Sequence, residues 1–210
     1  IAEPGGFVSA AIHSSVSGKV AKIDTIVDAS GYAKPAIFID VEGDEWEESI
    51  DRSETLVKEC SLTSEEIVKK IADAGIVGLG GACFPTQVKL CPPPSFKAEC
   101  VIINAVECEP YLTSDYRLML ERPEDLVMGL KVLLQLFDNA EGIIAIEDNK
   151  PEAIAKLQYL TQEEPKITVK PLKTKYPQGA ERQVIYVTTG RKIYSKMLPA
   201  DAGCVVDNVQ

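Results

Sequence analysis

The chain has 210 residues, of which 45% are hydrophobic and 26% are charged, and its formal net charge is −10 at pH 7. This composition is typical of a globular protein that holds one large domain or two small ones. The acidic balance argues against nucleic acid or an anionic membrane surface as a direct partner, and no apolar run is long enough to span a membrane.

The first 41 residues have the pattern of short β-strands, with small turn residues between apolar pairs and a good strand at residues 36–41. The stretch S-V-S-G-K-V resembles the hairpins of the barrel-sandwich hybrid fold of biotinyl and lipoyl domains, but lacks their carrier-lysine context. We therefore expect residues 1–41 to be a partial barrel-sandwich-hybrid segment that serves as a scaffold. Residues 42–54 are strongly acidic, which indicates a solvated linker.

From residue 55 onward the pattern alternates between helices and strands. Thr63 and Glu66 form a capping box in front of a helical apolar pattern, which Gly75 ends. The later elements are predicted, in chain order, as a loop of three prolines (92–94), strand 99–105, helix 123–139, strand 142–146, helix 150–160, strand 166–172 and helix 180–188. This alternation predicts a parallel or mixed sheet that is covered by helices on both faces.

A glycine-rich stretch, which we call the glycine loop (residues 78–84), contains Gly78, Gly80 and Gly81. Such a loop allows close approach to the backbone, and its bare amides can bind an anion. Pro85 suits the first position of a following helix, and Lys89, one turn later, can reach a phosphate. The stretch is neither a Walker A loop nor a G-x-G-x-x-G motif, and a helix precedes it. A tight interhelical turn without a ligand is the alternative.

Polar side chains follow the first buried strand of this second region. Asn104 offers a donor and an acceptor, whereas Glu107 and Glu109 offer acceptors only. Ligands of open α/β sheets bind at such strand ends, and these groups suit ribityl or ribose hydroxyls or the N–H edge of a heterocycle. The alternatives are a paired-carboxylate hydrolase, which lacks an aromatic sugar platform, and a divalent metal site, which lacks further oxygen ligands.

A third loop, Y-P-Q-G-A-E, follows the last predicted strand and carries Tyr176, Gly179 and Glu181. It is either a further ligand loop or a simple helix start with a carboxylate in its first turn. The six cysteines are scattered without any C-x-x-C pattern, which supports neither a zinc site nor an iron–sulfur cluster. We therefore expect reduced thiols and no metal.

Four ordered motifs give this chain a specific resemblance to RnfC, a subunit of the Rnf electron-transport complex. They are G-L-G-G-A-C-F-P-T-Q-V-K-L, N-A-V-E-C-E-P-Y-L-T-S-D, K-Y-P-Q-G-A-E-R-Q and L-P-A-D-A-G-C-V-V-D-N-V-Q. The N-terminal G-G-F-V-S-A-A-I-H-S-S-V-S-G-K-V also resembles that subunit, so the resemblance covers essentially the whole chain. The flavin subunit of respiratory complex I is similar more distantly. Leu79, Val106 and Ala180 replace an arginine, an aspartate and a glutamate of complex I, which favours the Rnf branch.

The resemblance implies that residues 55–210 form a complex-I-flavoprotein-like domain that binds FMN and NAD(H) and exchanges hydride between them. No protein nucleophile or acid–base residue is then required. The resemblance implies that the backbone of Gly78, Gly80 and Gly81 contacts the flavin and its phosphate, with Lys89 near that phosphate. It implies that Asn104 and Asn208 hydrogen-bond the FMN and that Glu107 and Glu109 lie between flavin and nucleotide. Phe84 would stack on the dinucleotide, and Tyr176, Gly179 and Glu181 would close the opposite side of the site.

The resemblance also implies a setting for the chain. It implies a peripheral flavoprotein subunit of an ion-translocating ferredoxin:NAD oxidoreductase, on the cytoplasmic face of the cell membrane, with the other Rnf subunits as partners. The paired C-x-x-C-x-x-C-x-x-x-C-P motifs of the family do not occur in these 210 residues. We therefore expect the 4Fe–4S clusters to lie outside them, and the FMN domain to be truncated at its C-terminus. The alternatives are a cobalamin-reducing relative from propanediol-use compartments and a non-catalytic docking module.

Overall fold

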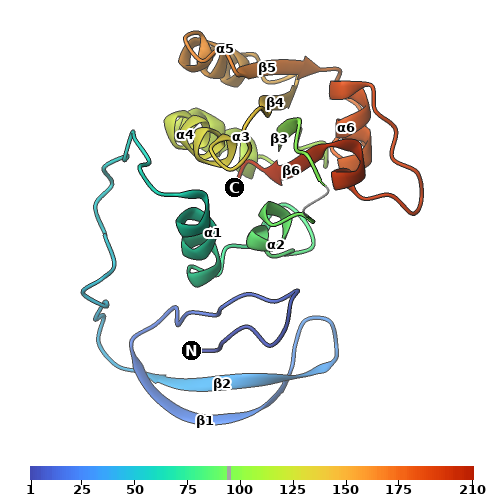
Figure 1. The fold of residues 1–210 in the computed structure, drawn as a ribbon. Coiled ribbons are helices and arrows are strands. Elements are labelled where there is room, and N and C mark those ends of the chain that lie inside the picture. The colour runs from blue at the N-terminus through green and yellow to red at the C-terminus, as the bar shows by residue number, and fades with distance from the viewer. Residues whose placement is uncertain (94–95) are drawn as a thin grey trace. The chain divides into compact units, whose positions relative to one another are not determined.

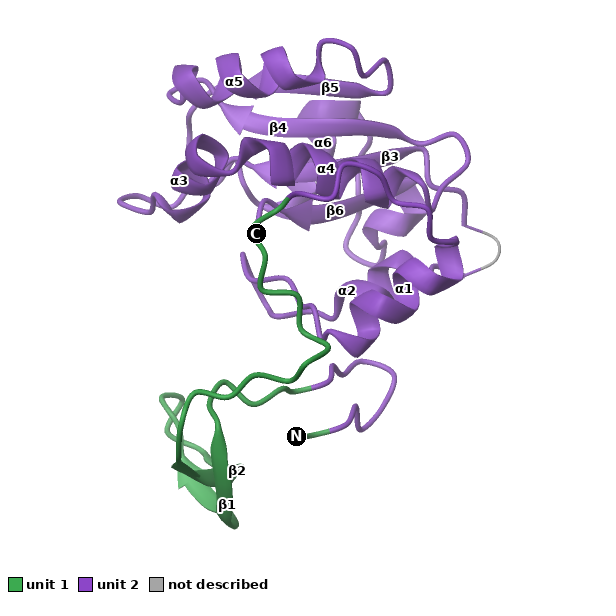
Figure 2. Ribbon diagram, turned by 90° about the vertical axis from the view of Figure 1, so that its left-hand side faces the viewer, with its two compact units in different colours: residues 1–2, 12–55 green, residues 3–11, 56–210 purple. Residues whose placement is uncertain are grey.

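The computed structural model describes residues 1–93 and 96–210, so Pro94 of the expected three-proline loop lies outside the described residues. Figure 1 shows the helices and strands, and Figure 2 shows two compact units. Unit 1 comprises residues 1–2 and 12–55, and unit 2 comprises residues 3–11 and 56–210.

Unit 1 is built around an antiparallel hairpin of β1 (Gly18–Val27) and β2 (Ala33–Val41). A register shift between Val20 and Lys22 marks a β-bulge in the first strand. Beyond the hairpin, Ser17 Oγ donates to the Glu45 carbonyl and accepts from the Glu45 N–H. The hairpin contains the strand expected at residues 36–41.

Unit 2 contains a four-stranded parallel sheet in the order β5-β4-β3-β6. Its strands are β3 (Cys100–Ala105), β4 (Glu141–Glu147), β5 (Ile167–Leu172) and β6 (Cys204–Asn208). Near-continuous apolar runs such as Val101–Ile103 form central strands because both faces of a parallel sheet are buried. The predicted α/β fold class and the three predicted strands are confirmed.

Helices cover both faces of this sheet (Figure 1). They are α1 (Ser64–Asp73), α2 (Thr86–Leu90), α3 (Ser114–Glu121), α4 (Pro123–Leu134), α5 (Pro151–Thr161), α6 (Glu181–Thr189) and the 3₁₀ helix η1 (Pro199–Ala202). The larger core packs α4 and α5 onto side chains such as Val101 and Ile103, and the smaller core packs α6 onto Ile102 and its neighbours. Successive side chains of β3 point to opposite faces of the sheet and so belong alternately to the two cores.

The capping box of α1 is confirmed, because the Thr63 side chain accepts from the Glu66 N–H and Glu66 accepts from the Thr63 N–H. Gly75 follows the helix with φ of 68°, as a helix stop requires.

Several element predictions are wrong in detail. Pro85 is the N-cap of α2 rather than its first helical residue, and α2 has only five residues, so its dipole is small. The helix predicted for residues 123–139 ends at Leu134. The structure also contains α3 and β6, for which the apolar periodicity gave no prediction.

Candidate functional site

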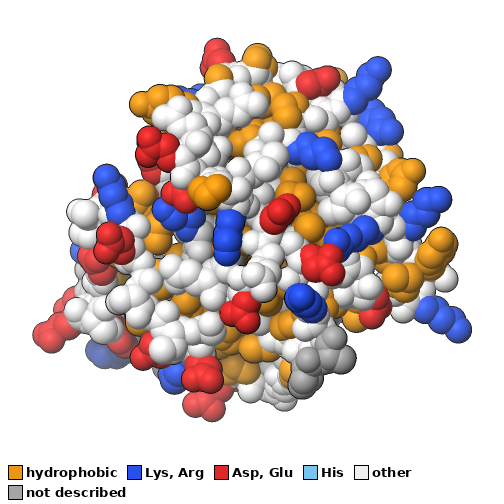
Figure 3. All heavy atoms as spheres, turned by 45° about the horizontal axis from the view of Figure 1, so that its top comes forward, with side chains coloured by type: hydrophobic (Ala, Val, Ile, Leu, Met, Phe, Trp, Pro, Cys, Tyr) orange, Lys and Arg blue, Asp and Glu red, His pale blue; other side chains and the backbone are white. Residues whose placement is uncertain are grey.

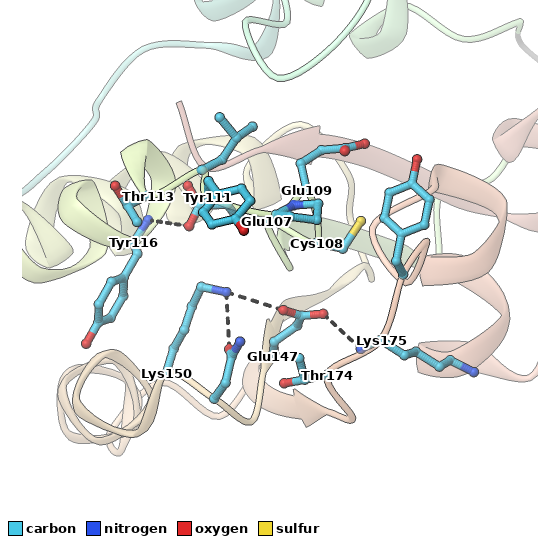
Figure 4. Close-up of a pocket in the computed structure, with 14 residues that line it drawn as sticks. Glu107, Cys108, Glu109, Tyr111, Thr113, Tyr116, Glu147, Lys150, Thr174 and Lys175 are labelled. Carbon is cyan, nitrogen blue, oxygen red and sulfur yellow. Dashed lines mark hydrogen bonds and ion pairs between the residues drawn. The ribbon is translucent and has the colours of Figure 1, made fainter.

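The carboxyl ends of the parallel strands lie at one edge of the sheet, where ligands bind in open α/β folds. A cavity of about 420 Å³ opens at the ends of β3, β4 and β5 (Figure 4). Of the predicted site residues, Glu107, Glu109 and Tyr176 line it, and the glycine loop does not. The volume lies in the range of small-molecule sites.

Hydrogen bonds join the second and third predicted ligand loops to each other and to the end of β6. Asn104 Nδ2 donates to the Gly179 carbonyl over 2.8 Å, and Asn208 Nδ2 donates to the Asn104 carbonyl over 3.2 Å. A Cβ at Gly179 would lie 3.0 Å from Cys108 Sγ, so the backbone of the third loop passes close to the second. The predicted asparagines therefore hold the ends of β3 and β6 and the start of α6 together.

The glycine loop approaches the sheet edge at Gly80. A Cβ there would lie 2.5 Å from Asn208 Cγ, whereas a Cβ at Gly81 would meet no atom within 4 Å. The left-handed backbone in this loop belongs to Cys83, with φ of 52°, and to none of its three glycines. Residues 79–82 form turns, and in the part of the chain that the structure describes the N–H groups of residues 79–84 donate no hydrogen bond of good geometry to a protein acceptor. A run of exposed, unpaired N–H groups suits a phosphate or another anion.

Lys89 lies at the same edge but is already engaged. Its Nζ donates to the Val206 carbonyl over 2.8 Å and lies 3.2 Å from Asp207 Oδ1. The second carboxylate oxygen of Asp207 is buried without a protein partner. The positive charge of Lys89 therefore lies at the end of β6, next to Asn208. The side chain is held in an ion pair and is not free to move toward a phosphate.

The two predicted carboxylates differ in their surroundings. Glu107 has φ of 47°, and its carboxylate accepts the N–H groups of Asp115 (2.8 Å) and Tyr116 (3.2 Å) at the start of α3. Figure 4 shows the bond from Tyr116. A carboxylate at this position stabilises the helix N-terminus. Glu109 is exposed. Glu109 is therefore the more exposed of the pair, whereas Glu107 is half-buried.

The remaining predicted residues have exposed side chains. Tyr176 is 64% exposed and Phe84 is 37% exposed, so both rings are accessible to a ligand. Glu181 is exposed at the first position of α6. On the face drawn in Figure 3, lysine and arginine side chains are interspersed with aspartate and glutamate, without a basic patch.

A buried aspartate, Asp115, is part of the site although it was not predicted. Only 7% exposed, it accepts from Asn208 Nδ2 over 2.9 Å and from Gln210 Nε2 over 2.6 Å. It therefore fixes the side-chain amide that faces Gly80. The available signal was its place as the last residue of the motif N-A-V-E-C-E-P-Y-L-T-S-D.

Two more residues that were not predicted, Glu147 and Lys150, lie buried at the cavity. They belong to the polar run E-D-N-K, which begins with the last residue of β4 and was the available signal. Beside them, the hydroxyl and N–H of Thr174 donate to Asp148 and hold the pKa of this carboxyl below its usual range. The loop after β5 is thus anchored to the end of β4.

Two other kinds of site are absent from the described residues. No group of three or more His, Cys, Asp or Glu side chains there is arranged to hold a metal ion. No helix in the same part of the chain is long and apolar enough to cross a lipid bilayer.

Two protein-family models match this chain, one in its N-terminal part and one in its C-terminal part. The family model of the Nuo51 FMN-binding domain matches residues 71–210, and that of the RnfC barrel sandwich hybrid domain matches residues 1–44. These matches agree with the expected FMN domain and the expected barrel-sandwich-hybrid segment.

Individual relatives match the chain over its whole length. The C subunit of the Na(+)-translocating ferredoxin:NAD(+) oxidoreductase complex of Acetobacterium woodii is 46% identical, over all of this chain and 47% of the relative. The corresponding subunit of the proton-translocating complex of Clostridium ljungdahlii is also 46% identical, over all of this chain and 45% of the relative. The corresponding subunit of the ion-translocating oxidoreductase complex of Pseudomonas aeruginosa is 41% identical, over all of this chain and 27% of the relative. The chain spans less than half the length of these relatives.

Solved structures show a similar fold. An NAD+-reducing NiFe-hydrogenase in its H2-reduced state superimposes with a TM-score of 0.59 at 25% identity, over 70% of this chain and 29% of that chain. The air-oxidised state of such a hydrogenase gives a TM-score of 0.60 at 25% identity, over 70% of this chain and 28% of that chain.

Proposed function

Because the chain belongs to the family of the Nuo51 FMN-binding domain and resembles the C subunits of ion-translocating oxidoreductase complexes throughout, we propose that it is the NAD(H)-reactive flavoprotein portion of such a complex. In this proposal it binds FMN without a covalent bond and exchanges electrons with a nicotinamide cofactor. The observation that carries the proposal is the close approach of Gly80 to Asn208 beside six unpaired backbone N–H groups.

The phosphate end of FMN would bind at the glycine loop. The N–H groups of residues 79–84 donate no hydrogen bond of good geometry to a protein acceptor among the described residues, and Lys89 adds a positive charge nearby. Each such contact contributes from a few tenths to about 2 kcal/mol. Several such contacts must therefore act together with burial of the ring system to hold FMN. Asn208 lies beside the glycine loop and is hydrogen-bonded to Asn104 at the edge of the sheet.

The nicotinamide nucleotide would bind on the cavity side of the same edge. Glu109 offers an exposed carboxylate for hydroxyl or amide groups, and the rings of Phe84 and Tyr176 offer accessible stacking surfaces. Gly179 and Glu181 would close the far side. Glu107 acts indirectly in this proposal, because its carboxylate caps α3 and so holds the loop that carries Glu109.

The chemistry of the reaction belongs to the cofactor. Bound FMN supplies two-electron exchange with the nicotinamide and one-electron transfer to later carriers. The protein's own groups therefore need only bind, orient and shield. In the whole complex, electrons would pass to 4Fe–4S clusters outside these 210 residues. The chain would lie as a peripheral subunit on the cytoplasmic face of the membrane, in contact with the other subunits.

Reconstitution tests this proposal directly. Titration of the purified chain with FMN should quench flavin fluorescence to a saturable end point. The loaded protein should then oxidise NADH with ferricyanide as the electron acceptor, at a rate proportional to bound flavin. Saturable flavin binding without NADH oxidation would reject the activity, and the absence of flavin binding would leave a docking module as the remaining interpretation.

A further inference from the structure

A buried ion pair lies beneath the cavity at the end of β4. Lys150 Nζ stands 3.5 Å from Glu147 Oε2, and the two side chains are only 8% and 3% exposed. Both residues line the cavity, and Figure 4 shows the lysine extending toward the glutamate. Burying two charges away from water is costly unless their polar atoms have hydrogen-bond partners, so the other contacts of the two side chains show what the pair holds in place.

The ammonium group of Lys150 has three protons and three acceptors. Besides Glu147, it donates to the Val106 carbonyl over 3.0 Å and to Asn149 Oδ1 over 3.3 Å. Val106 directly precedes Glu107 in the loop after β3. The lysine therefore fixes the first residue of the segment that carries both predicted carboxylates.

Glu147 makes the matching connection on the other side. Its Oε1 accepts the N–H of Lys175 over 3.2 Å, in the loop after β5 that leads to Tyr176. The pair thus links the loop after β3 to the loop after β5 across the end of β4. Both linked loops line the cavity.

The glycine loop depends on a different set of contacts. Asp115 holds Asn208, and Asn208 bonds to the Asn104 carbonyl and faces Gly80. Lys150 makes no hydrogen bond to any of these four residues in the described structure. The two sets of contacts therefore differ, and the loop after β3 connects them, because the Val106 N–H donates to Asn104 Oδ1 and Glu107 accepts the Asp115 N–H.

We propose that Lys150, paired with Glu147, is a positioning residue that holds residues 106–111 and 173–176 in the geometry that binds the nicotinamide dinucleotide. This inference rests on the proposed function and deepens it: the Lys150 pair supports the nucleotide side, and the Asp115 contacts support the flavin phosphate side. The Lys150 side chain acts through the two loops and needs no contact with a ligand.

The test uses the FMN-loaded chain with Lys150→Met. A displaced loop can cost a factor of ten or more in the use of a substrate, so we expect the KM for NADH to rise about tenfold. The Kd for FMN, measured by fluorescence quenching, should change much less than the KM for NADH, because Lys150 makes no hydrogen bond to Asp115, Asn208, Asn104 or Gly80 in the described structure. Hydrogen exchange should become faster at residues 106–111 and 173–176 and remain unchanged in β3.

Two further variants make the result specific. Lys156→Met is the matched control, because Lys156 lies on α5, the helix that Lys150 precedes, and likewise donates to a backbone carbonyl, that of Leu120, but is exposed. It should leave every measurement at its wild-type value. Glu147→Gln/Lys150→Met removes both charges, so it avoids an uncompensated buried carboxylate if the single variant folds poorly.

Three outcomes decide the matter. A raised KM in the double variant, with faster exchange in both loops, supports positioning by Lys150. A wild-type KM or unchanged loop exchange in the folded variants would overturn it. If the wild-type chain binds FMN but does not oxidise NADH, the proposed function fails instead, and hydrogen exchange in the variants alone decides whether Lys150 positions the two loops.

Discussion

The side-chain amide of Asn208 lies so close to Gly80 that any Cβ at residue 80 would stand 2.5 Å from its Cγ. Real Cβ atoms do not approach a heavy atom this closely, so a side chain would force the loop or the asparagine to move. Asn208 is itself held by Asp115, which limits its freedom to shift. The glycine at position 80 is therefore required by the packing of the loop and not by its backbone torsion.

Replacing Gly80 by alanine tests this packing. Overpacking of this kind costs about 1–3 kcal/mol, and we expect Gly80→Ala to lower the free energy of unfolding by that amount in urea denaturation without FMN. Gly81→Ala is the matched control and should change it by less than about 0.5 kcal/mol, because its Cβ meets no atom within 4 Å. Equal effects of the two substitutions would contradict the close contact.

Asp115→Asn should weaken FMN binding. The substitution keeps the shape but turns one acceptor oxygen into a donor that faces the amide of Asn208 or Gln210. An unsatisfied buried group costs about 1–3 kcal/mol, which corresponds to a Kd for FMN raised about 5- to 150-fold if the whole cost falls on the bound state. Asp138→Asn, at an exposed position, should leave the Kd unchanged. Fluorescence quenching by the two variants would decide whether Asp115 orients Asn208.

The two threonines that precede α1 and α3 should respond differently to alanine. Thr63 caps α1 with its side chain, so Thr63→Ala should cost about 1 kcal/mol in thermal or urea unfolding. Thr113 makes no capping bond, because Glu107 takes the first N–H groups of α3. Thr113→Ala should therefore change stability by less than about 0.5 kcal/mol. A large loss at Thr113 would show that Glu107 is not the effective cap.

Alkaline pH should destabilise the fold through two facing thiols. Cys100 and Cys204 are paired across β3 and β6, and burial raises the pKa of Cys204 to about 11 and that of Cys100 in the same direction. The folded state thus holds these protons more tightly than the unfolded state does. The resulting stability is present below the unfolded pKa, near 9, and is lost as pH rises toward about 11.

The measurement is the urea midpoint across this pH range. In wild type the midpoint should fall between pH values of about 8.5 and about 10.5, and in Cys204→Ala the fall should be smaller. Cys91→Ala removes an exposed thiol and should follow the wild-type curve. A Cys204→Ala curve parallel to that of wild type would mean that the buried thiol does not control the pH dependence.

The sequence predicted those elements whose signals are local. Each apolar run (β3, β4 and β5) and the capping box of α1 is formed by residues only a few positions apart in the sequence, and the structure contains all of them. Helix α3 was missed because its first N–H groups are satisfied by Glu107, several residues upstream, and not by its own N-cap side chain. Strand β6 was missed because its short run is buried only by pairing with β3.

The sequence by itself determined the α/β class and the family resemblance and predicted three ligand loops, because these depend on periodicity and on motifs of short range. Only the tertiary structure decided which side chains hold those loops: Asn208 meets Asn104 across 104 positions, and Lys150 reaches Val106 across 44. Hydrogen-bond partners of buried polar groups are chosen by the proximity of strand ends, and that proximity arises only when the parallel sheet assembles. For this reason the roles of Asp115, Glu147 and Lys150 became visible only in the fold, although each lies in a motif or polar run of the sequence.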